Sequence, residues 1–502
     1  MNFVDQFVAI FSPSAGIRRA QERKILAKIR SYDGAAKGGH RVKNWRANSS
    51  GANVANSSAM VTLRNRARDL ERNSPIARRA LDVIVSNVVG AGIIPEAKGR
   101  ENVQGATDRA RALDELFVRW GDTREIDADG MMDFYALQGL VLRSVVRDGE
   151  VFIRKRRRRM RDRLSIPMQL QVLESDFCDE SKNETLTNGG VIINGVEFDA
   201  IGRVRGYWMF KTHPTDVYRN KDNFTSEFIP ADEIIHVFRR DRPGQVRGIS
   251  WFAPVMVKIR ELQDAVDFEL VRRKTTAAFA GFITDSNLDD YDSEEEVELA
   301  SHIEPGTMEV LPPGRDVKFS SPPDAAGFGE FERIQMHHIA AGLGISYEAL
   351  TSDLTGVNFS SARVGRLEFQ RNIDIWRHHL IIPQFCVPVL LEFARIAEIA
   401  TDFKADGVFF VHTPPKKEFI DPRQELMALK DAMRLGVRSL PDVIREMGHD
   451  PEQVLDEIAQ SNKMLDDRDL VLDSDPRKVT LSGNAFDPMS PGGESGENLG
   501  SD

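Results

Sequence analysis

Residues 253–280 read APVMVKIRELQDAVDFELVRRKTTAAFA and carry a helical pattern. Apolar side chains recur along one face and charged side chains occupy the others, which is typical of an amphipathic helix. The apolar positions are Val255, Ile259, Leu262, Val266 and Leu270, and the charged positions include Lys258, Glu261, Asp264 and Asp267. At 1.5 Å per residue, the predicted helix is ~40 Å long.

A polar segment, residues 284–323, follows this helix. Its acidic residues are Asp289, Asp290, Asp292, Glu294, Glu295, Glu296 and Glu298. It also contains a predicted strand pair, 307–311 and 317–320, joined by Pro-Pro-Gly. A second helix is predicted over 331–341. The sequence therefore indicates two helices separated by an acidic insert that cannot continue either of them.

Upstream of the long helix, the pattern indicates helices first and strands second. Ser74-Pro75 is a typical N-cap and first-turn pair, and it opens a helix that ends at Gly90 and Gly92. Further helices are predicted over 106–120 and 134–147. Short strands bounded by Gly, Asn, Asp and Pro follow at 151–153, 170–173, 195–198, 204–210 and 234–238. We therefore predict an α+β fold class.

Downstream of the second helix, the chain is predicted to be mainly helical. A loop containing Gly and Asn precedes a long helix over 361–399, which Pro383 and Pro388 are expected to kink. Two further helices are predicted to start at Asp421-Pro422 and Asp450-Pro451, where Asp caps the helix and Pro occupies its first turn.

Both ends of the chain have little capacity to form a core of their own. Apolar residues near the start recur at helical spacing, but no basic residues precede them as in a signal peptide; they are Phe3, Val4, Phe7, Val8 and Phe11. Residues 31–60 are rich in Gly, Asn, Ser and Ala and are expected to form a linker or arm. The polar tail beyond Leu470 is expected to be disordered. Without a secretion signal, the protein is expected to stay in the cytoplasm where it is made.

The composition is that of a core-forming protein that is not globally basic. The 502 residues include 67 Lys plus Arg and 77 Asp plus Glu, a formal charge of −10, and 41% are apolar. Such a chain is not expected to bind phosphates over its whole surface. Cys178 and Cys386 are far apart, which excludes a disulfide scaffold and a structural zinc site. The longest apolar run, 380–391, is shorter than the ~20 residues of a membrane span, so none is expected.

The calcium-like pattern in the chain is incomplete. Glu125, Asp127, Asp129 and Gly130 match the start of an EF-hand loop, but the twelfth position, which requires a bidentate Glu, is Ala136. We interpret this segment as a solvated loop that caps the next helix through Asp133.

Other catalytic and metal patterns are also missing. The adjacent pairs His337-His338 and His378-His379 point to different sides of a helix. Neither a G-x-x-x-x-G-K-[ST] phosphate loop nor a G-x-S-x-G motif is present. No catalytic, cofactor-binding or metal-binding residue is predicted, and the protein is not expected to be an enzyme.

One run is strongly basic. It consists of Arg154, Lys155, Arg156, Arg157, Arg158, Arg159, Arg161 and Arg163, with Met160 and Asp162 between them. Such a run is typical of nucleic-acid contact, but aromatic residues for stacking on bases are missing. A nucleic-acid surface, a surface for an acidic partner and the solvated end of a β-hairpin all remain open.

Several segments together resemble the lambda-family portal proteins of tailed bacteriophages. They are RNRARDLERNSP at 64–75, NVVGAGI at 87–93, RDGEVF at 147–152, HVF at 236–238, RPGQVRG at 242–248, GLGISYE at 342–348, NFSSAR at 358–363 and Asp421-Pro422. These segments occur in family order over about residues 60–460.

The resemblance implies a portal fold that assembles as a ring, usually of twelve subunits, at the unique capsid vertex. Double-stranded DNA would pass through the ring during packaging and ejection. The implied partners are terminase, a head–tail adaptor, and the major capsid and scaffold proteins, with no membrane and no cofactor. The protein would be made in the host bacterial cytoplasm and reside in the virion.

The resemblance also implies regions of the subunit. They are an N-terminal arm (1–60), an α+β wing (61–250), a first stem helix (251–282), a clip (283–327), a second stem helix (328–352), a tunnel loop (353–360), a long kinked wing helix (361–400), a crown (401–470) and a disordered tail (471–502). The acidic residues 289–298 fall in the clip. The DNA-facing tunnel loop comprises Leu354, Thr355, Gly356, Val357, Asn358 and Phe359. Because each phosphate contact adds affinity through counterion release, an acidic ring would let DNA slide.

Two other functions remain open from the sequence. A monomeric DNA-binding adaptor would be centred on the basic run. A metal-dependent nuclease would use carboxylates such as Asp127, Asp129 and Glu150.

Overall fold

The computed structural model describes residues 49–216, 225–277, 282–284, 309–311, 327–355, 359–401, 403–416, 419, 421–472 and 477. The chain divides into two compact units, Met1–Ala55 and Asn56–Asp502. The apolar residues 3–11, the acidic residues 289–298, the predicted strand 317–320 and most of the tail lie outside the described residues. The account below concerns the second unit.

Helices form the first layer of this unit: α4 (Met60–Asn73), α5 (Pro75–Val88), α6 (Ala106–Trp120) and α7 (Phe134–Asp148). The predicted caps are confirmed, because Ser74 Oγ accepts from the Ala77 amide and Asp133 Oδ1 from the Ala136 amide. Helix α4 was not predicted, and α3 (Ala52–Ser57) lies in the segment interpreted as a linker. The apolar face of α4 is short and includes the aliphatic part of a buried arginine, Arg64, which hydrophobic periodicity does not detect.

Two antiparallel sheets follow the helices, which confirms the predicted mixture of helix and sheet. The first has the order β3-β2-β9, with β2 (Glu150–Arg157) between β3 (Met168–Leu173) and β9 (Ile234–Phe238). The second runs in sequence order through β4 (Glu184–Thr185), β5 (Val191–Ile193), β6 (Val196–Phe198), β7 (Val204–Met209) and β8 (Glu227–Pro230). Strand β2 continues four residues beyond the predicted 151–153, into the basic run.

A third pairing joins distant parts of the chain. Strand β1 (Ile94–Gly99) pairs antiparallel with β12 (Val408–Thr413). Neither strand was predicted. Because β12 lies in the range expected for the crown, its pairing attaches the start of that range to the α+β part.

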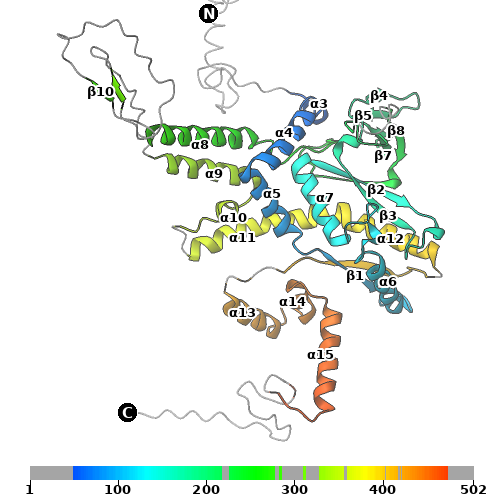
Figure 1. Cartoon of the computed structure of the whole chain (residues 1–502). Coiled ribbons are helices and arrows are strands. Elements are labelled where there is room, and N and C mark those ends of the chain that lie inside the picture. The colour runs from blue at the N-terminus through cyan, green and yellow to red at the C-terminus, as the bar shows by residue number, and fades with distance from the viewer. Residues whose placement is uncertain are drawn as a thin grey trace, which may run out of the picture. The chain divides into compact units, whose positions relative to one another are not determined.

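Helices α8 (Met256–Ala277) and α9 (Phe328–Leu343) lie side by side (Figure 1). They run antiparallel, since Lys258 Nζ near the start of α8 lies 3.1 Å from His338 Nδ1 near the end of α9. Helix α8 begins three residues later than the predicted 253–280, whose last three residues lie outside the described part of the chain, and α9 is longer than the predicted 331–341.

The described part of the insert contains one strand of the predicted pair. Strand β11 (Glu309–Leu311) lies within the predicted 307–311 and pairs in parallel with β10 (Phe282–Thr284), whereas the predicted hairpin with residues 317–320 lies outside the described residues. Strand β10 was not predicted, because it has only three residues and ends where the polar insert begins.

The predicted long helix consists of α11 (Phe359–Trp376), a π-helical segment (Arg377–Cys386) and α12 (Val387–Ala400). Pro383 lies inside the π-helical segment, where the altered hydrogen-bond register accommodates its missing amide. Where the sequence predicts a kink at Pro383, the structure therefore has a change from α-helix to π-helix. Residues Arg363–Ala400 are long and apolar enough to cross a membrane, but 61% of the apolar window is buried inside the protein, as in a core helix.

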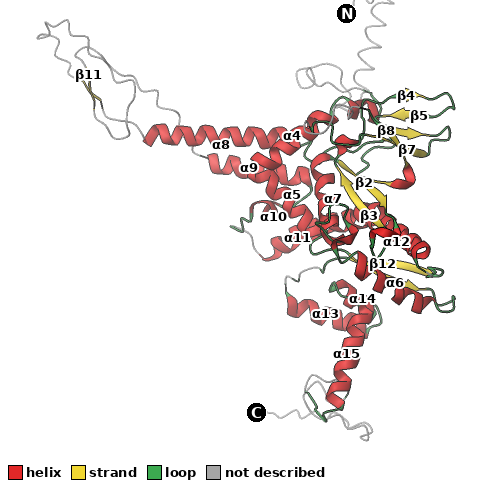
Figure 2. Cartoon of the chain, turned by 45° about the vertical axis from the view of Figure 1, so that its right-hand side comes forward, coloured by secondary structure: helices red, strands yellow, loops and turns green. Residues whose placement is uncertain are grey.

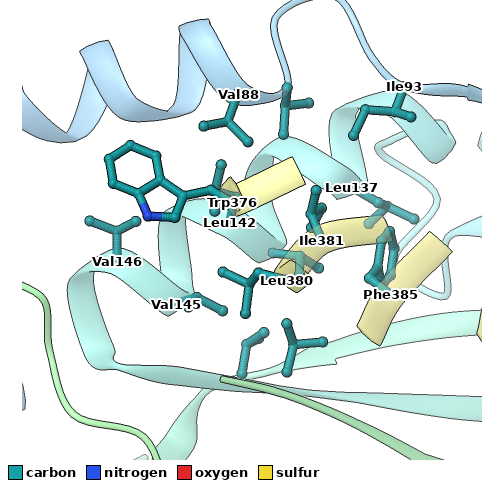
Figure 3. Packing of buried hydrophobic residues seen from close by; sticks show 14 of the residues in the cluster. Val88, Ile93, Leu137, Leu142, Val145, Val146, Trp376, Leu380, Ile381 and Phe385 are labelled. Carbon is teal, nitrogen blue, oxygen red and sulfur yellow. The ribbon is translucent and has the colours of Figure 1, made fainter. Parts of the chain in front are cut away.

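This helix lies at the centre of the main hydrophobic core. Figure 3 shows Leu380, Ile381 and Phe385 packed against α7 residues such as Leu137 and Val145. A smaller cluster around Phe152 and Tyr207 joins the two sheets. Every residue labelled in Figure 3 is at most 8% exposed.

Among the described residues, three helices follow β12: α13 (Pro422–Arg434), α14 (Leu440–Glu446) and α15 (Pro451–Asp466), in orange tones in Figure 1 and in red in Figure 2. Asp421 and Asp450 cap α13 and α15 as predicted, through the amides of Gln424 and Glu452. The short helix α14 was not predicted.

Candidate functional site

A buried ion pair connects strand β2 to the loop after β9. Arg247 Nε donates to Glu150 Oε1 at 2.7 Å, and each residue is only 1% exposed. Glu150 Oε2 also accepts from the Gly248 amide and lies 2.9 Å from His236 Nε2. Burial opposes ionisation of Glu150, but the charge of Arg247 and the hydrogen bonds from His236 and Arg247 hold its pKa far below the usual value.

Further charged residues extend this junction to the first helices. Ser175 Oγ donates to Glu150 Oε1 at 2.5 Å and accepts from Arg64 Nη1 of α4 at 3.0 Å. Arg68, one turn later on α4, binds both carboxylate oxygens of Asp148 at the end of α7. The network therefore ties α4, α7 and β2 together.

Two glycines allow these segments to meet. Gly149 has φ +99, and a Cβ there would lie 2.4 Å from the carbonyl carbon of Ile249. A Cβ on Gly248 would lie 2.1 Å from the Gly149 carbonyl oxygen. The segments 64–75, 147–152, 236–238 and 242–248 of the resemblance thus converge on one buried junction, which explains their residue types structurally.

Three of the carboxylates considered for calcium binding or nuclease chemistry are already engaged, and the fourth, Asp129, is exposed. Asp127 accepts from the amides of Asp129, Met131 and Met132, and Glu125 Oε2 accepts from Ser165. Glu150 is held by Arg247. Asp133 caps α7, so the interpretation of this segment as a capping loop is confirmed for that residue.

Within the described residues, one group has ligand atoms close enough to share a metal ion: Glu174, Asp176 and His213. The sequence did not reveal this group, because the three residues meet only through folding. Arg68 Nη2 lies among them, 2.6 Å from Asp176 and 3.2 Å from Glu174. A guanidinium already neutralises these carboxylates, so the arrangement is an ion-pair cluster.

The side chains of the first histidine pair point to different partners, as predicted. His337 stacks on Tyr347 with ring centroids 4.1 Å apart, while His338 faces Lys258.

Helices α8 and α9 pack closely at one end and expose apolar side chains further along. Ile259 of the predicted stripe is completely buried, whereas Leu270 is half exposed. Phe268 is 75% exposed, and Phe331 and Ile334 of α9 are nearly half exposed. The stripe therefore serves the subunit core at its start and leaves an apolar surface beyond it.

The loop between α10 (Tyr347–Thr351) and α11 is anchored at its first residues. Asp353 accepts from the Tyr347 hydroxyl at 3.0 Å and from the amide and hydroxyl of Thr355. Leu354 is 69% exposed. Gly356, Val357 and Asn358 lie outside the described residues, and Phe359 is the first residue of α11.

The basic run occupies the end of β2 and the turn towards β3. Arg157 and the residues from Arg158 to Arg163 are exposed, while Arg154, Lys155 and Arg156 are partly covered. The solvated hairpin end proposed from the sequence fits this position.

Comparison with known sequences identifies the family. The sequence model described as "Phage portal protein, lambda family" matches residues 38–377, more than half of the chain. The chain belongs to the lambda family of phage portal proteins. The matched residues contain the buried junction, both helices α8 and α9, and the loop after α10.

Individual portal proteins are similar over most of their length. The chain is 28% identical over 424 residues to a probable portal protein of Halomonas phage phiHAP-1, covering 80% of this chain and 79% of the relative. It is 23% identical over 385 residues to portal protein B of Escherichia phage lambda, covering 68% and 70%. A chain in the neck of a native gene transfer agent particle, computed with C12 symmetry, is 13% identical with a TM-score of 0.40 and covers 78% of this chain and 94% of that chain.

Membership of this family gives the chain a structural role as a phage portal protein and a place in the phage particle. Portal proteins are structural rather than enzymatic, and the engaged carboxylates agree with that. The nuclease alternative is therefore wrong.

Proposed function

We propose that this portal protein assembles into a ring of about twelve copies at the unique capsid vertex, and that double-stranded DNA passes through the ring during packaging and ejection. The observation that carries the proposal is the apolar surface of the paired helices α8 and α9. A single subunit leaves this surface in contact with water.

The exposed residues define the surface that neighbouring copies would cover. They are Val257, Phe268 and Val271 on α8, and Phe331 and Ile334 on α9. Burying such side chains stabilises an assembly by roughly 25 cal/mol per Å² of apolar area. A heterologous contact between identical subunits closes into a ring when the rotation between copies closes.

The proposed regions follow the resemblance. Residues 61–250 form the wing, and α8 and α9 are the stem helices within the ranges 251–282 and 328–352. The clip comprises 283–327, the tunnel loop 353–360 and the long wing helix 361–400. The crown comprises 401–470, although its strand β12 pairs with β1 of the wing range.

The proposed partners follow from these regions. The clip, with acidic residues 289–298 that lie outside the described residues, would dock terminase and later the head–tail adaptor. The wing and crown would face the major capsid and scaffold proteins during assembly in the host cytoplasm.

The tunnel loop would contact DNA weakly. Its described residues Leu354 and Thr355 carry no positive charge. Because Asp353 fixes Thr355 at one end and α11 begins at Phe359, the loop would act as a steric collar with few phosphate contacts.

Negative-stain microscopy and light scattering of the purified full chain test the proposal. We expect closed rings with a central hole and a mass of about twelve subunits. A monomer that binds duplex DNA in a salt-dependent manner would support the adaptor function instead and contradict the ring.

A further inference from the structure

Strand β2 presents its basic residues on two opposite faces. Successive side chains of a strand alternate between faces, so Arg154 and Arg156 share one face with Phe152. Arg158 follows in the same alternation, and its amide donates to the Pro167 carbonyl across the hairpin. Lys155 and Arg157 share the other face.

Carboxylates face both basic side chains on the second face. Lys155 Nζ lies 3.5 Å from Glu392 Oε2 of α12. Arg157 Nη2 lies 3.4 Å from Asp232 Oδ2. Each of these two positive charges therefore has an acidic partner within the subunit.

Neutral amides hold the guanidinium groups on the first face. Arg156 Nε donates to Gln171 Oε1 at 2.8 Å, and Arg158 Nε donates to Gln169 Oε1 at 2.8 Å. Neither arginine forms an ion pair with a carboxylate of the described residues. Arg154 forms an ion pair with Glu233, with Nη2 3.6 Å from Oε2, and its buried Nε has no hydrogen-bond partner in the described part of the chain.

These arginines repel one another. Burial lowers the pKa of Arg156, the charges of Arg154 and Arg158 lower it further, and the charge of Glu233 opposes this shift. Side chains two residues apart on a strand are separated by about 7 Å, so the three groups form a row of like charges. A row of anionic groups bound along this face would relieve the repulsion.

We propose that Arg154, Arg156 and Arg158 form a binding site for the phosphate backbone of duplex DNA. The guanidinium group matches phosphate oxygens in a bidentate geometry, and the glutamines orient it before binding. Aromatic residues, which accompany arginine in the hot spots of protein–protein interfaces, are missing between Arg154 and Arg158. Contacts of this type are independent of base sequence.

The site goes beyond the proposed conduit. It lies on strand β2, whereas the proposed tunnel loop connects α10 and α11, and it would hold DNA where the loop would let it slide. Its test is independent of ring formation, because it compares the two faces of one strand.

Fluorescence anisotropy with a labelled 20-base-pair duplex tests the site in the full-length protein. The variant Arg156→Gln/Arg158→Gln is compared with Lys155→Gln/Arg157→Gln, which removes the same charge from the opposite face. Arg395 still pairs with Glu392 in the control variant. We expect the first variant to lose about tenfold or more in affinity at low salt. Its salt dependence, the slope of log K against log [salt], should fall by about 2, because each phosphate contact contributes about 0.9.

The control variant should stay within about twofold of the unmodified protein. Equal weakening of both variants, or of neither, would overturn the site. If Arg156→Gln/Arg158→Gln loses its circular dichroism signal, the single variant Arg158→Gln is measured instead, because Arg158 is exposed. This variant should reduce the slope of log K against log [salt] by about 1.

A competition experiment separates DNA from an acidic protein partner. Unlabelled duplex should displace the labelled DNA at a lower concentration of charged groups than polyglutamate. If polyglutamate competes as well as duplex does, and its own binding depends on Arg156 and Arg158, the face recognises acidic polypeptide and the DNA assignment is wrong.

Discussion

Arg247 binds Glu150 where the loop after β9 crosses strand β2, and water reaches neither side chain. Both residues belong to sequence segments that resemble the portal family, and both serve the interior of the subunit. Arg247 also donates to the carbonyl oxygens of Asn194 and Ser175, so it connects the two sheets as well.

Replacing Arg247 with Ala should lower the free energy of unfolding by about 3–5 kcal/mol, because it leaves the Glu150 charge buried without its main partner. Urea unfolding followed by circular dichroism measures this change. The control is Arg371→Ala, which breaks an exposed pair with Glu368 and should cost about 0–1 kcal/mol. Similar costs for the two variants would contradict the assigned role of the junction.

The packing of α9 against Val255, the residue before α8, can be tested with two glycines of α9. A Cβ on Gly342 would lie 2.3 Å from Val255 Cγ1, whereas a Cβ on Gly329 would meet nothing within 4 Å. Gly342→Ala should therefore destabilise the subunit by about 1–3 kcal/mol. Gly329→Ala should be neutral or stabilise it by up to about 1 kcal/mol. Thermal unfolding distinguishes them, and equal melting temperatures would count against close packing at Gly342.

Two substitutions on α8 separate folding from assembly. Ile259 is fully buried, so Ile259→Asp should prevent the subunit from folding. Phe268 is 75% exposed, so Phe268→Asp should leave a folded subunit that fails to form rings. Circular dichroism and light scattering report the two properties. Intact rings of Phe268→Asp would contradict the proposed assembly surface.

Deleting Leu354–Phe359 should leave ring assembly intact, because the deleted segment begins beyond Asp353 and its contact with Tyr347. Phages that carry this deletion should package or retain less DNA. Counting filled and empty heads by microscopy measures the effect, and a Gly/Ser replacement of equal length serves as the control. Normal numbers of filled heads would remove the assignment of this segment as the tunnel loop.

The buried carboxyl group of Glu96 should make the stability of the protein depend on pH where β1 contacts α15. Burial raises its pKa from the ordinary value of 4.5 to about 7; Lys98 opposes this shift and Asp450 reinforces it. A raised pKa favours the protonated form in the folded state, so its stabilising effect is fully present below pH 4.5 and is lost as the pH rises through 7.

The variant Glu96→Gln mimics the protonated form while Lys98 keeps its contact with Glu452. It should raise the melting temperature by roughly 2 °C at pH 8 and leave it unchanged at pH 4. Glu452→Gln removes the other carboxylate that contacts Lys98 and should not raise the melting temperature at pH 8. An equal effect of Glu96→Gln at both pH values would disprove the role of this carboxyl group.

Local chemistry in the sequence predicted the elements whose signals are contained within one turn or one strand. Ser74, Asp133, Asp421 and Asp450 cap their helices as expected, because capping depends on a side chain and an amide two or three residues later. The periodic stripe of α8 was predicted for the same reason. Helix α4 was missed because its buried positions include Arg64, whose polarity conceals its place in the core.

The sequence by itself determined the α+β class, the two helices with the insert between them, and the residue types at the Glu150 junction, since periodicity, caps and glycines act over short distances. Only the tertiary structure decided which face of each element is covered. The pairing of β1 with β12, the burial of Ile259 and the exposure of Phe268 depend on contacts between distant residues. The different partners of Arg156, which contacts Gln171, and of Lys155, which lies near Glu392, have the same origin, because neighbours in a strand point to opposite sides.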